Sequence, residues 1–115
     1  MVSVMTEEPI FTRIGERRAE KMLDEFEACV DAMYVVVKVE TKNKIMVQLT
    51  EAYGPMTFRY IYLLGKPGRR PWGGRVIKND NDTTSLGKSE LKWIFSVIGL
   101  AWRNAKRKGE CPYVL

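Results

Sequence analysis

The chain has 115 residues, of which 45% are hydrophobic and 29% are charged, and its formal net charge is +5. This length and composition predict one globular domain with one core and exclude an intrinsically disordered chain. The positive charge favours an anionic partner, such as nucleic acid, an acidic protein or a membrane surface. Histidine is absent, which excludes histidine-based triads and makes zinc sites a poor fit.

The cysteines, Cys29 and Cys111, form no CxxC motif and no disulfide framework. Cys29 falls within an apolar helical stripe, and we expect it to be a small core side chain. This cysteine usage predicts a reducing, intracellular setting, cytoplasmic or nuclear. The first residues lack the basic region of a signal peptide, and no apolar run approaches the roughly 20 residues of a spanning helix, so we expect no membrane partner.

Residues 1–12 are expected to be a flexible leader, followed by a single α+β domain over 13–109 and a tail over 110–115. From Thr12 to Met33, apolar side chains recur every three or four residues, which predicts an amphipathic helix. Acidic residues fill most of the remaining positions, so this helix is a poor surface for nucleic acid. The apolar stripe comprises Ala19, Met22, Leu23, Phe26, Cys29, Val30 and Met33.

The hydrophobic period then falls to two, which is typical of strands. We predict strands over Tyr34–Glu40, Lys44–Tyr53 and Met56–Leu64, with a short fourth strand over Arg75–Lys78. The TKN segment is short enough for a hairpin turn, and Gly54-Pro55 predicts another turn. In the third strand, one face carries aromatic rings that could point either into the core or toward a ligand: Phe58, Tyr60 and Tyr62.

The polar segment NDNDTTS, residues 79–85, predicts a turn that leads into the last helix. Ser85 or Gly87 is the expected cap of this helix, and Gly109 its expected end. Its predicted buried stripe is Leu91, Ile94, Phe95, Ile98, Ala101, Trp102 and Ala105. The expected fold class is therefore α+β, with an N-terminal helix, a three- to four-stranded antiparallel meander and a C-terminal amphipathic helix. Such a sheet can leave one face open to solvent for function.

Catalysis finds little support in the sequence. There is no nucleophile elbow, no phosphate-binding glycine signature and no metal-binding cluster, so we expect neither an enzyme nor a cofactor or metal. Scattered carboxylates near the strand ends are interpreted as solvated turn residues rather than a magnesium site: Glu40, Glu51, Asp80 and Asp82.

The segment KPGRRPWGGR, Lys66 to Arg75, combines four cations with Trp72 and no acid. Cations that follow a phosphate backbone and flat rings that stack on bases are the mixture that holds single-stranded nucleic acid. Trp72 lies between Pro71 and two glycines, so we expect it to be a contact residue rather than a core anchor. The predicted nucleic-acid contacts are Lys42, Lys44, Arg59, Lys66, Arg69, Arg70, Trp72, Arg75, Arg103, Lys106 and Arg107.

The stretch YVVVKVETKNKIMVQLTEAY, Tyr34 to Tyr53, resembles the first hairpin of the positive-cofactor-four single-stranded-DNA-binding family. The later TTSLGKSELKWIFSVI, Thr83 to Ile98, resembles the family's final turn and amphipathic helix. The resemblance implies a whirly-like dimer that binds single strands, with Lys38, Lys42 and Lys44 on the DNA-binding hairpin. It covers about a third of the chain, which also carries an N-terminal helix and an extra segment, 55–82, that the family domain does not need.

The sequence therefore favours a non-catalytic, basic protein that binds single-stranded DNA or RNA. We expect a homodimer, because the apolar residues from Trp93 to Trp102 are too many to face one sheet. An alternative is a protein-interaction module, such as a viral or host-factor inhibitor, that docks an acidic or hydrophobic partner through residues 66–75. A further alternative is an RNA-scaffold subunit that prefers structured RNA.

Overall fold

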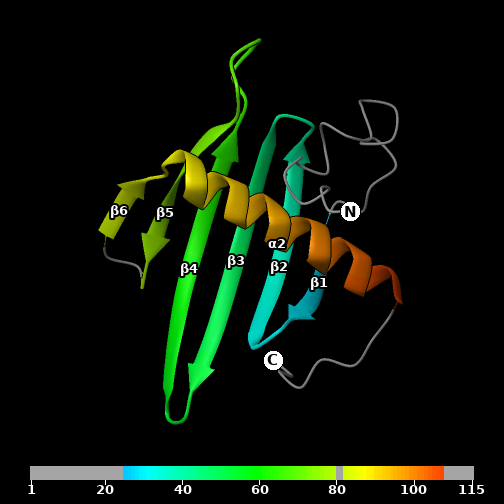
Figure 1. Cartoon of the computed structure of the whole chain (residues 1–115), viewed down its shortest axis with the longest axis vertical. Helices are drawn as coiled ribbons and strands as arrows, with labels where there is room; N and C mark the ends of the chain where they lie inside the picture. Colours follow the sequence, from blue (N-terminus) through cyan, green and yellow to red (C-terminus); the bar gives the residue numbers. More distant parts are fainter. Residues whose placement is uncertain (1–24, 80–81, 108–115) are drawn as a thin grey trace.

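The computed structural model describes residues 25–79 and 82–107, which form one antiparallel sheet and one helix. The six strands pair in sequence order (Figure 1), so each is joined to the next by a turn or loop. The strands are β1 (Glu25–Val30), β2 (Met33–Thr41), β3 (Lys44–Tyr53), β4 (Met56–Gly65), β5 (Gly73–Lys78) and β6 (Asp82–Ser85). The helix, α2 (Lys88–Arg107), crosses the sheet from the side of β5 and β6 to β1.

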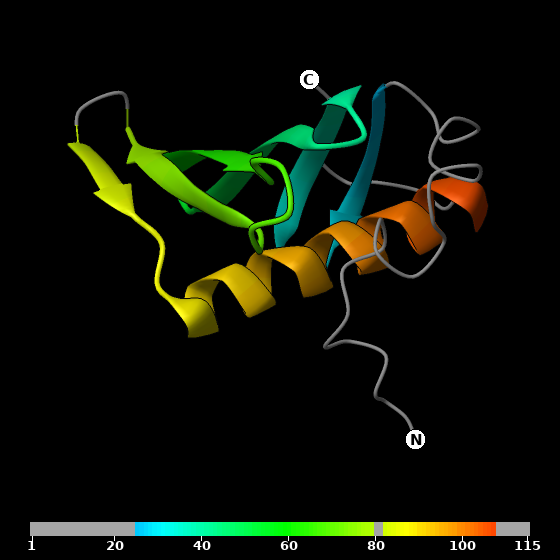
Figure 2. The same cartoon turned by 90° about the horizontal axis from the view of Figure 1, so that it is seen from above.

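The sheet curves around α2, so that the helix lies against its concave side (Figure 2). The strand register places alternate residues toward this helix face. Val37, Val47 and Tyr62 form one cross-strand row that continues to Val76. Their side chains are buried together with those of Ile94 and others from the helix. The rings of the third predicted strand, whose direction the sequence left open, therefore lie on the helix side of the sheet.

Four consecutive strands, β2 to β5, begin and end close to the predicted positions. The predicted sheet of three to four strands is nevertheless wrong, because β1 and β6 extend it on both sides. β6 comprises Asp82–Ser85, within the segment predicted as a turn. Its four polar residues are all exposed, so this edge strand has no hydrophobic alternation to reveal it.

The predicted helix over Thr12–Met33 is wrong in its C-terminal part, which forms β1 and the start of β2. The segment EFEACV fits the helical period through Phe26, Cys29 and Val30 and the strand period through Phe26, Ala28 and Val30. The residues of the strand period are the ones buried beneath α2. Hydrogen-bonded pairing with β2 selects the strand conformation over the helix. The remainder of that helix, the leader over 1–12 and the tail over 110–115 lie outside the described residues.

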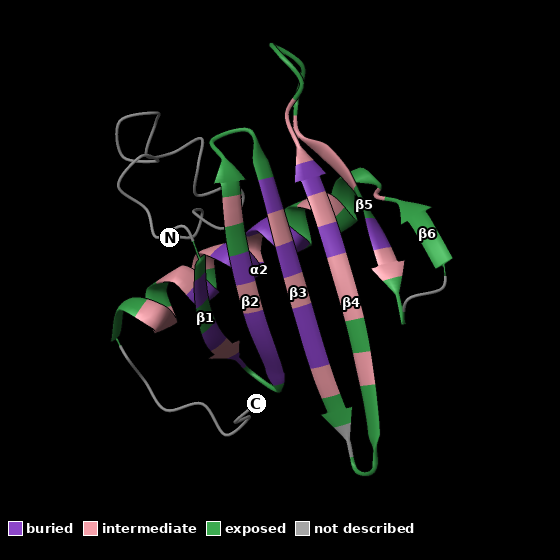
Figure 3. Ribbon diagram, turned by 180° about the vertical axis from the view of Figure 1, so that it is seen from behind, coloured by how far each residue is buried: buried purple, intermediate pink, exposed green. Residues whose placement is uncertain are grey.

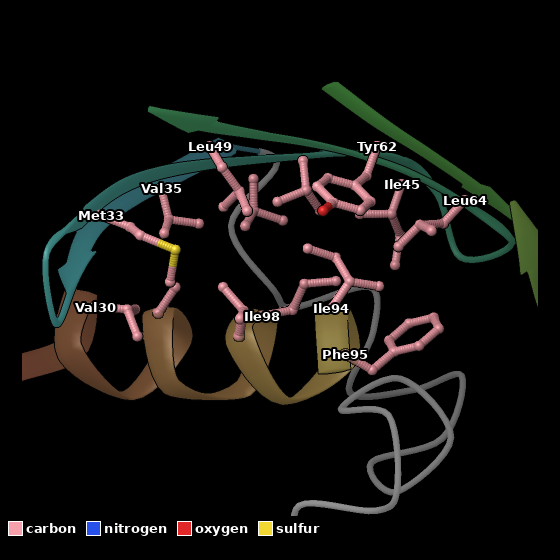
Figure 4. Packing of buried hydrophobic residues seen from close by; sticks show 14 of the residues in the cluster. Val30, Met33, Val35, Ile45, Leu49, Tyr62, Leu64, Ile94, Phe95 and Ile98 are labelled. Atoms are coloured by element: carbon pink, nitrogen blue, oxygen red, sulfur yellow. The ribbon is translucent and has the colours of Figure 1, made fainter. Parts of the chain in front are cut away.

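The C-terminal helix is confirmed, and its first residues hydrogen-bond in the predicted way. The Leu91 amide donates to the Gly87 carbonyl at 3.0 Å, which places Gly87 at the cap. Figure 4 shows Ile94 and Ile98 pointing up into the curved sheet beneath Leu49, Tyr62 and Ile45. Because the sheet wraps the helix, Val97 is buried in addition to the predicted stripe, and Trp102 packs edge-to-face on Phe26 at 5.2 Å between centroids.

Candidate nucleic-acid interface

The turn between β2 and β3 and the loop between β4 and β5 lie at the same end of the sheet (Figure 1). The Lys66 amide donates to the Asn43 carbonyl at 2.9 Å, which ties the loop to the turn. Successive connections of a meander alternate between its two ends, so these two connections meet although more than twenty residues separate them. We call this region the basic end; it comprises Lys42, Lys44, Lys66, Arg69 and Arg70.

Each connection holds its cations outward by local hydrogen bonding. In the β2–β3 turn, the Asn43 amide donates to the Thr41 hydroxyl at 3.1 Å. In the loop, the Arg70 amide donates to the Pro67 carbonyl at 3.0 Å, and Gly68 takes a φ of 59° that suits glycine. This tight turn presents Arg69 and Arg70 to solvent, where both are exposed.

Arg75 extends the positive charge from the basic end onto the open face, which is the sheet face opposite α2. Arg75 is exposed and lies beside Leu63 in the register. Lys38 lies in the same row, opposite Glu25 in the β1–β2 register, and Glu40 lies near the β2–β3 turn. These carboxylates offset part of the positive charge on the β1 side.

The other predicted contacts lie elsewhere. Arg59 is exposed on the open face toward the opposite end of the sheet, where its backbone amide donates to the Asn79 side-chain oxygen at 3.0 Å. Arg103, Lys106 and Arg107 occupy the end of α2 beside β1 (Figure 1). The Lys106 ammonium lies 5.0 Å from the centroid of the Trp102 ring, a cation–π contact within the protein. The predicted cations therefore divide between separate regions.

The expectation that Trp72 is not part of the core is wrong. Its ring meets Phe95 edge-to-face at 5.2 Å between centroids and packs against the hydrophobic cluster. The neighbouring glycines do not form a loose arm, because Gly73 and Gly74 pair with Gly65 and Leu64 as the start of β5. A Cβ at Gly74 would lie 2.6 Å from the Leu63 carbonyl oxygen, so glycine is needed here for close strand pairing.

The rings of the third predicted strand face α2 rather than the open face. Tyr62 is buried, and Tyr60 is partly buried against the core. On the open face, the ring of Tyr34 is also buried, and its hydroxyl is hydrogen-bonded to Glu27. Burial, followed by the Glu27 contact, raises the pKa of Tyr34 to about 12. The described part of the open face therefore has the cations expected for nucleic acid but no exposed ring for stacking.

The middle of the open face is largely half-buried (Figure 3, which views this face). Half-buried Met46, Leu63 and Ile61 lie next to one another in the register of β3 and β4. Cys29 is also on this face; it is disulfide-bonded, and its partner falls outside the described residues. The prediction that Cys29 is a core side chain is wrong, since the strand period turns it away from the helix.

Within the described residues, no helix is both long enough and apolar enough to cross a membrane. The same residues hold no group of three or more acidic or cysteine side chains placed to bind a metal ion. No protein-family model, curated protein or solved structure matches the chain. The resemblance to the positive-cofactor-four family, the homodimer and the intracellular setting therefore stay predictions.

Sequence reasoning identified the cations of the basic end, but it did not predict that the two connections carrying them lie side by side. Their proximity follows from the topology, because the connections of a meander alternate between the two ends of the sheet. The first and third connections of four consecutive strands therefore lie at the same end. Sequence reasoning interpreted Glu51 as a solvated turn residue, and it singled out neither Trp93 nor Glu90 as a binding residue. For Trp93 a signal existed, since it lies outside the predicted buried stripe of its helix yet is large and apolar.

Proposed function

We propose that this protein binds nucleic acid through the basic end, by contacts to phosphates rather than to bases. The single observation that carries the proposal is the junction of the β2–β3 turn with the β4–β5 loop, which gathers Lys42, Lys44, Lys66, Arg69 and Arg70. Lysine and arginine side chains that neutralise phosphates release counterions, and this supplies affinity without regard to sequence.

The proposal differs from the sequence-based one in its substrate preference. Preference for single strands depends on rings that stack on bases, and Trp72, Tyr60 and Tyr62 pack toward the helix side. We therefore propose comparable affinity for single-stranded and duplex oligonucleotides of equal length. Arg75 and the apolar residues of the open face would border the bound backbone.

Two triple variants with the same change in charge test the proposal. The basic-end variant is Lys42→Gln/Arg69→Gln/Arg70→Gln, and the matched control is Arg103→Gln/Lys106→Gln/Arg107→Gln. At low salt, we expect the basic-end variant to weaken binding of a fluorescein-labelled 20-mer on the order of 100-fold, and the control to weaken it less than about fivefold.

Both variants remove three positive charges, so a difference in their affinity for the oligonucleotide reports the position of the charges and not their number. Equal losses in the two variants would show that only net charge matters and would reject the basic end as the site. Circular dichroism checks that both variants remain folded, which is expected because the substituted side chains of the basic end are exposed. Retention of full affinity by the basic-end variant would reject the proposal outright.

A further inference from the structure

A second surface lies on the opposite side of α2 from Trp72. β3 and β4 continue past the line where α2 crosses them (Figure 1), so the helix leaves part of the concave face uncovered. The large hydrophobic side chains that are most exposed in the described residues are Met56 at 57%, Trp93 at 46% and Leu100 at 38%. Register and helical position place all of them around this uncovered part.

Two contacts on this side of the helix fix this placement. Trp93 lies beside Tyr62 of β4, with 6.4 Å between ring centroids. Asn104, on the same side of the helix, donates to the Cys29 carbonyl at 2.8 Å, at the end of β1 away from the basic end. Leu100 lies between Trp93 and Asn104 on this side, one turn before Asn104 and two turns after Trp93.

The strand supplies the other half of the surface. Met56, Phe58 and Tyr60 alternate along β4 on the face that also bears Tyr62. Phe58 and Tyr60 are partly exposed. We call this region the aromatic surface; it comprises Met56, Phe58, Tyr60, Trp93 and Leu100.

Two carboxylates border the aromatic surface. Glu51 lies opposite Phe58 in the β3–β4 register, and Glu90 is in the first turn of α2. Both are near enough to act on Tyr62. Burial, then the charge of Glu90, and then Tyr60 and Glu51 raise the pKa of Tyr62 to about 12. Lys78, opposite Tyr60 on β5, marks the boundary of the surface on that side.

Rings accompanied by carboxylates form the environment that attracts an organic cation. The face of an indole or phenol ring attracts an ammonium or guanidinium group, and the attraction grows where water is excluded. Carboxylates add charge-assisted hydrogen bonds. A second copy of this chain fits less well, since pairing this surface with itself would bring the carboxylates of Glu51 and Glu90 toward their own counterparts.

We propose that the aromatic surface binds a basic peptide segment of a partner protein. An arginine or lysine of the peptide lies against Trp93 and Tyr60, between Glu51 and Glu90. Apolar residues of the peptide cover Met56 and Leu100. This site lies across α2 from the basic end, so one molecule can hold nucleic acid and a basic protein at the same time. The inference does not depend on the proposed function.

The test uses the full chain and a fluorescein-labelled peptide of twelve alternating arginine and leucine residues, followed by fluorescence anisotropy. Trp93→Leu keeps apolar area but removes the ring, and we expect at least about a fivefold loss of affinity. Glu90→Gln removes one carboxylate, and we expect about a threefold loss. Glu25→Gln, an exposed carboxylate on the open face, is the matched control and should bind as the unmodified chain does.

Several results would overturn the proposal. One is equal affinity of the Trp93→Leu variant and the unmodified chain. Another is equal binding of a peptide in which uncharged glutamine replaces arginine, because the proposal requires a cation. Sedimentation of the same samples tests the alternative occupant: a dimer that Trp93→Leu converts to a monomer, without peptide binding, would assign the surface to a second copy. The basic-end triple variant should bind the peptide unchanged, which separates this site from the proposed nucleic-acid interface.

Discussion

The basic end and the aromatic surface lie on opposite sides of the same helix, and each has what the other lacks. The basic end gathers cations from two connections, while its ring, Trp72, is turned inward onto Phe95. The aromatic surface exposes Trp93 beside Tyr62 and is bordered by Glu51 and Glu90. In the sequence, cations and rings alternate along the same segments. The comparison teaches that packing on α2 separates them into two surfaces of opposite chemistry.

The largest effect on stability should come from the tryptophan that is turned inward. Trp72→Ala removes the contact with Phe95 and leaves a space at the edge of the core, and we expect the free energy of unfolding to fall by about 3 kcal/mol. Trp93→Ala, the matched change on the aromatic surface, should cost less than about 1 kcal/mol because this ring is 46% exposed.

Urea denaturation of the two variants measures this difference. Similar losses of stability would contradict the assignment of one ring to the core and the other to a surface. Trp72→Phe, which retains an aromatic ring against Phe95, should recover part of the loss.

The pairing of β4 with β5, which positions the loop between them, should be disrupted by the addition of one methyl group at Gly74. Gly74→Ala puts a Cβ 2.6 Å from the Leu63 carbonyl oxygen, and we expect a loss of about 2 kcal/mol in unfolding free energy. Gly73→Ala is the control, because a Cβ there meets nothing within 4 Å.

The same two glycine variants also test whether the basic end and the aromatic surface are independent of each other. Displacement of β5 should weaken nucleic-acid binding at the basic end in the Gly74→Ala variant, whereas binding of the arginine–leucine peptide should persist. Loss of both activities in a folded Gly74→Ala protein would show that the surfaces are not independent.

Alkaline pH should weaken the fold through Tyr34 and Tyr62. The pKa of each is raised from 10.0 to about 12 in the folded protein, so each hydroxyl keeps its proton more tightly when folded. The stabilising contribution is therefore complete below pH 10 and is lost as the pH rises toward 12.

Urea midpoints measured at intervals between pH 9 and pH 12 follow this loss. Tyr62→Phe, which cannot ionise beside Glu90, should flatten the decline, and Tyr34→Phe, which has no hydroxyl to ionise beside Glu27, should do the same. A decline that is unchanged in the double variant would assign the alkaline sensitivity to other groups.

The smallest effect concerns the side of α2 that bears the aromatic surface. Asn104 donates to the Cys29 carbonyl at 2.8 Å, and its replacement by alanine should cost about 1 kcal/mol. Hydrogen exchange of the α2 amides should show faster opening of its last turns, with the β4–β5 loop unaffected. Uniform acceleration across the sheet would contradict a local role.

Much of the fold could be predicted because periodicity reports burial directly. The alternation in β3 and the helical stripe around Ile94 and Ile98 each match one period only. β1 could not be predicted, since EFEACV satisfies both periods and its pairing with β2 decides between them. β6 has four exposed polar residues and therefore no pattern.

For the candidate site, the sequence identified the cations but not the orientation of the rings. Trp72 is flanked by proline and glycines, which is typical of an exposed loop, yet a neighbour from α2, Phe95, draws it inward. That contact joins residues distant in the chain and has no local signal. The position of the Lys66–Asn43 contact, by contrast, follows from the alternation of turns in a meander.

The salt dependence of nucleic-acid binding tests the central claim most directly. Each lysine or arginine that neutralises a phosphate adds about 0.7 to 0.9 to the slope of log affinity against log salt concentration. We predict that Lys42→Gln/Arg69→Gln/Arg70→Gln lowers this slope by about two or more, and that Arg103→Gln/Lys106→Gln/Arg107→Gln leaves it nearly unchanged. A slope that falls in the helix variant and persists in the basic-end variant would contradict the account.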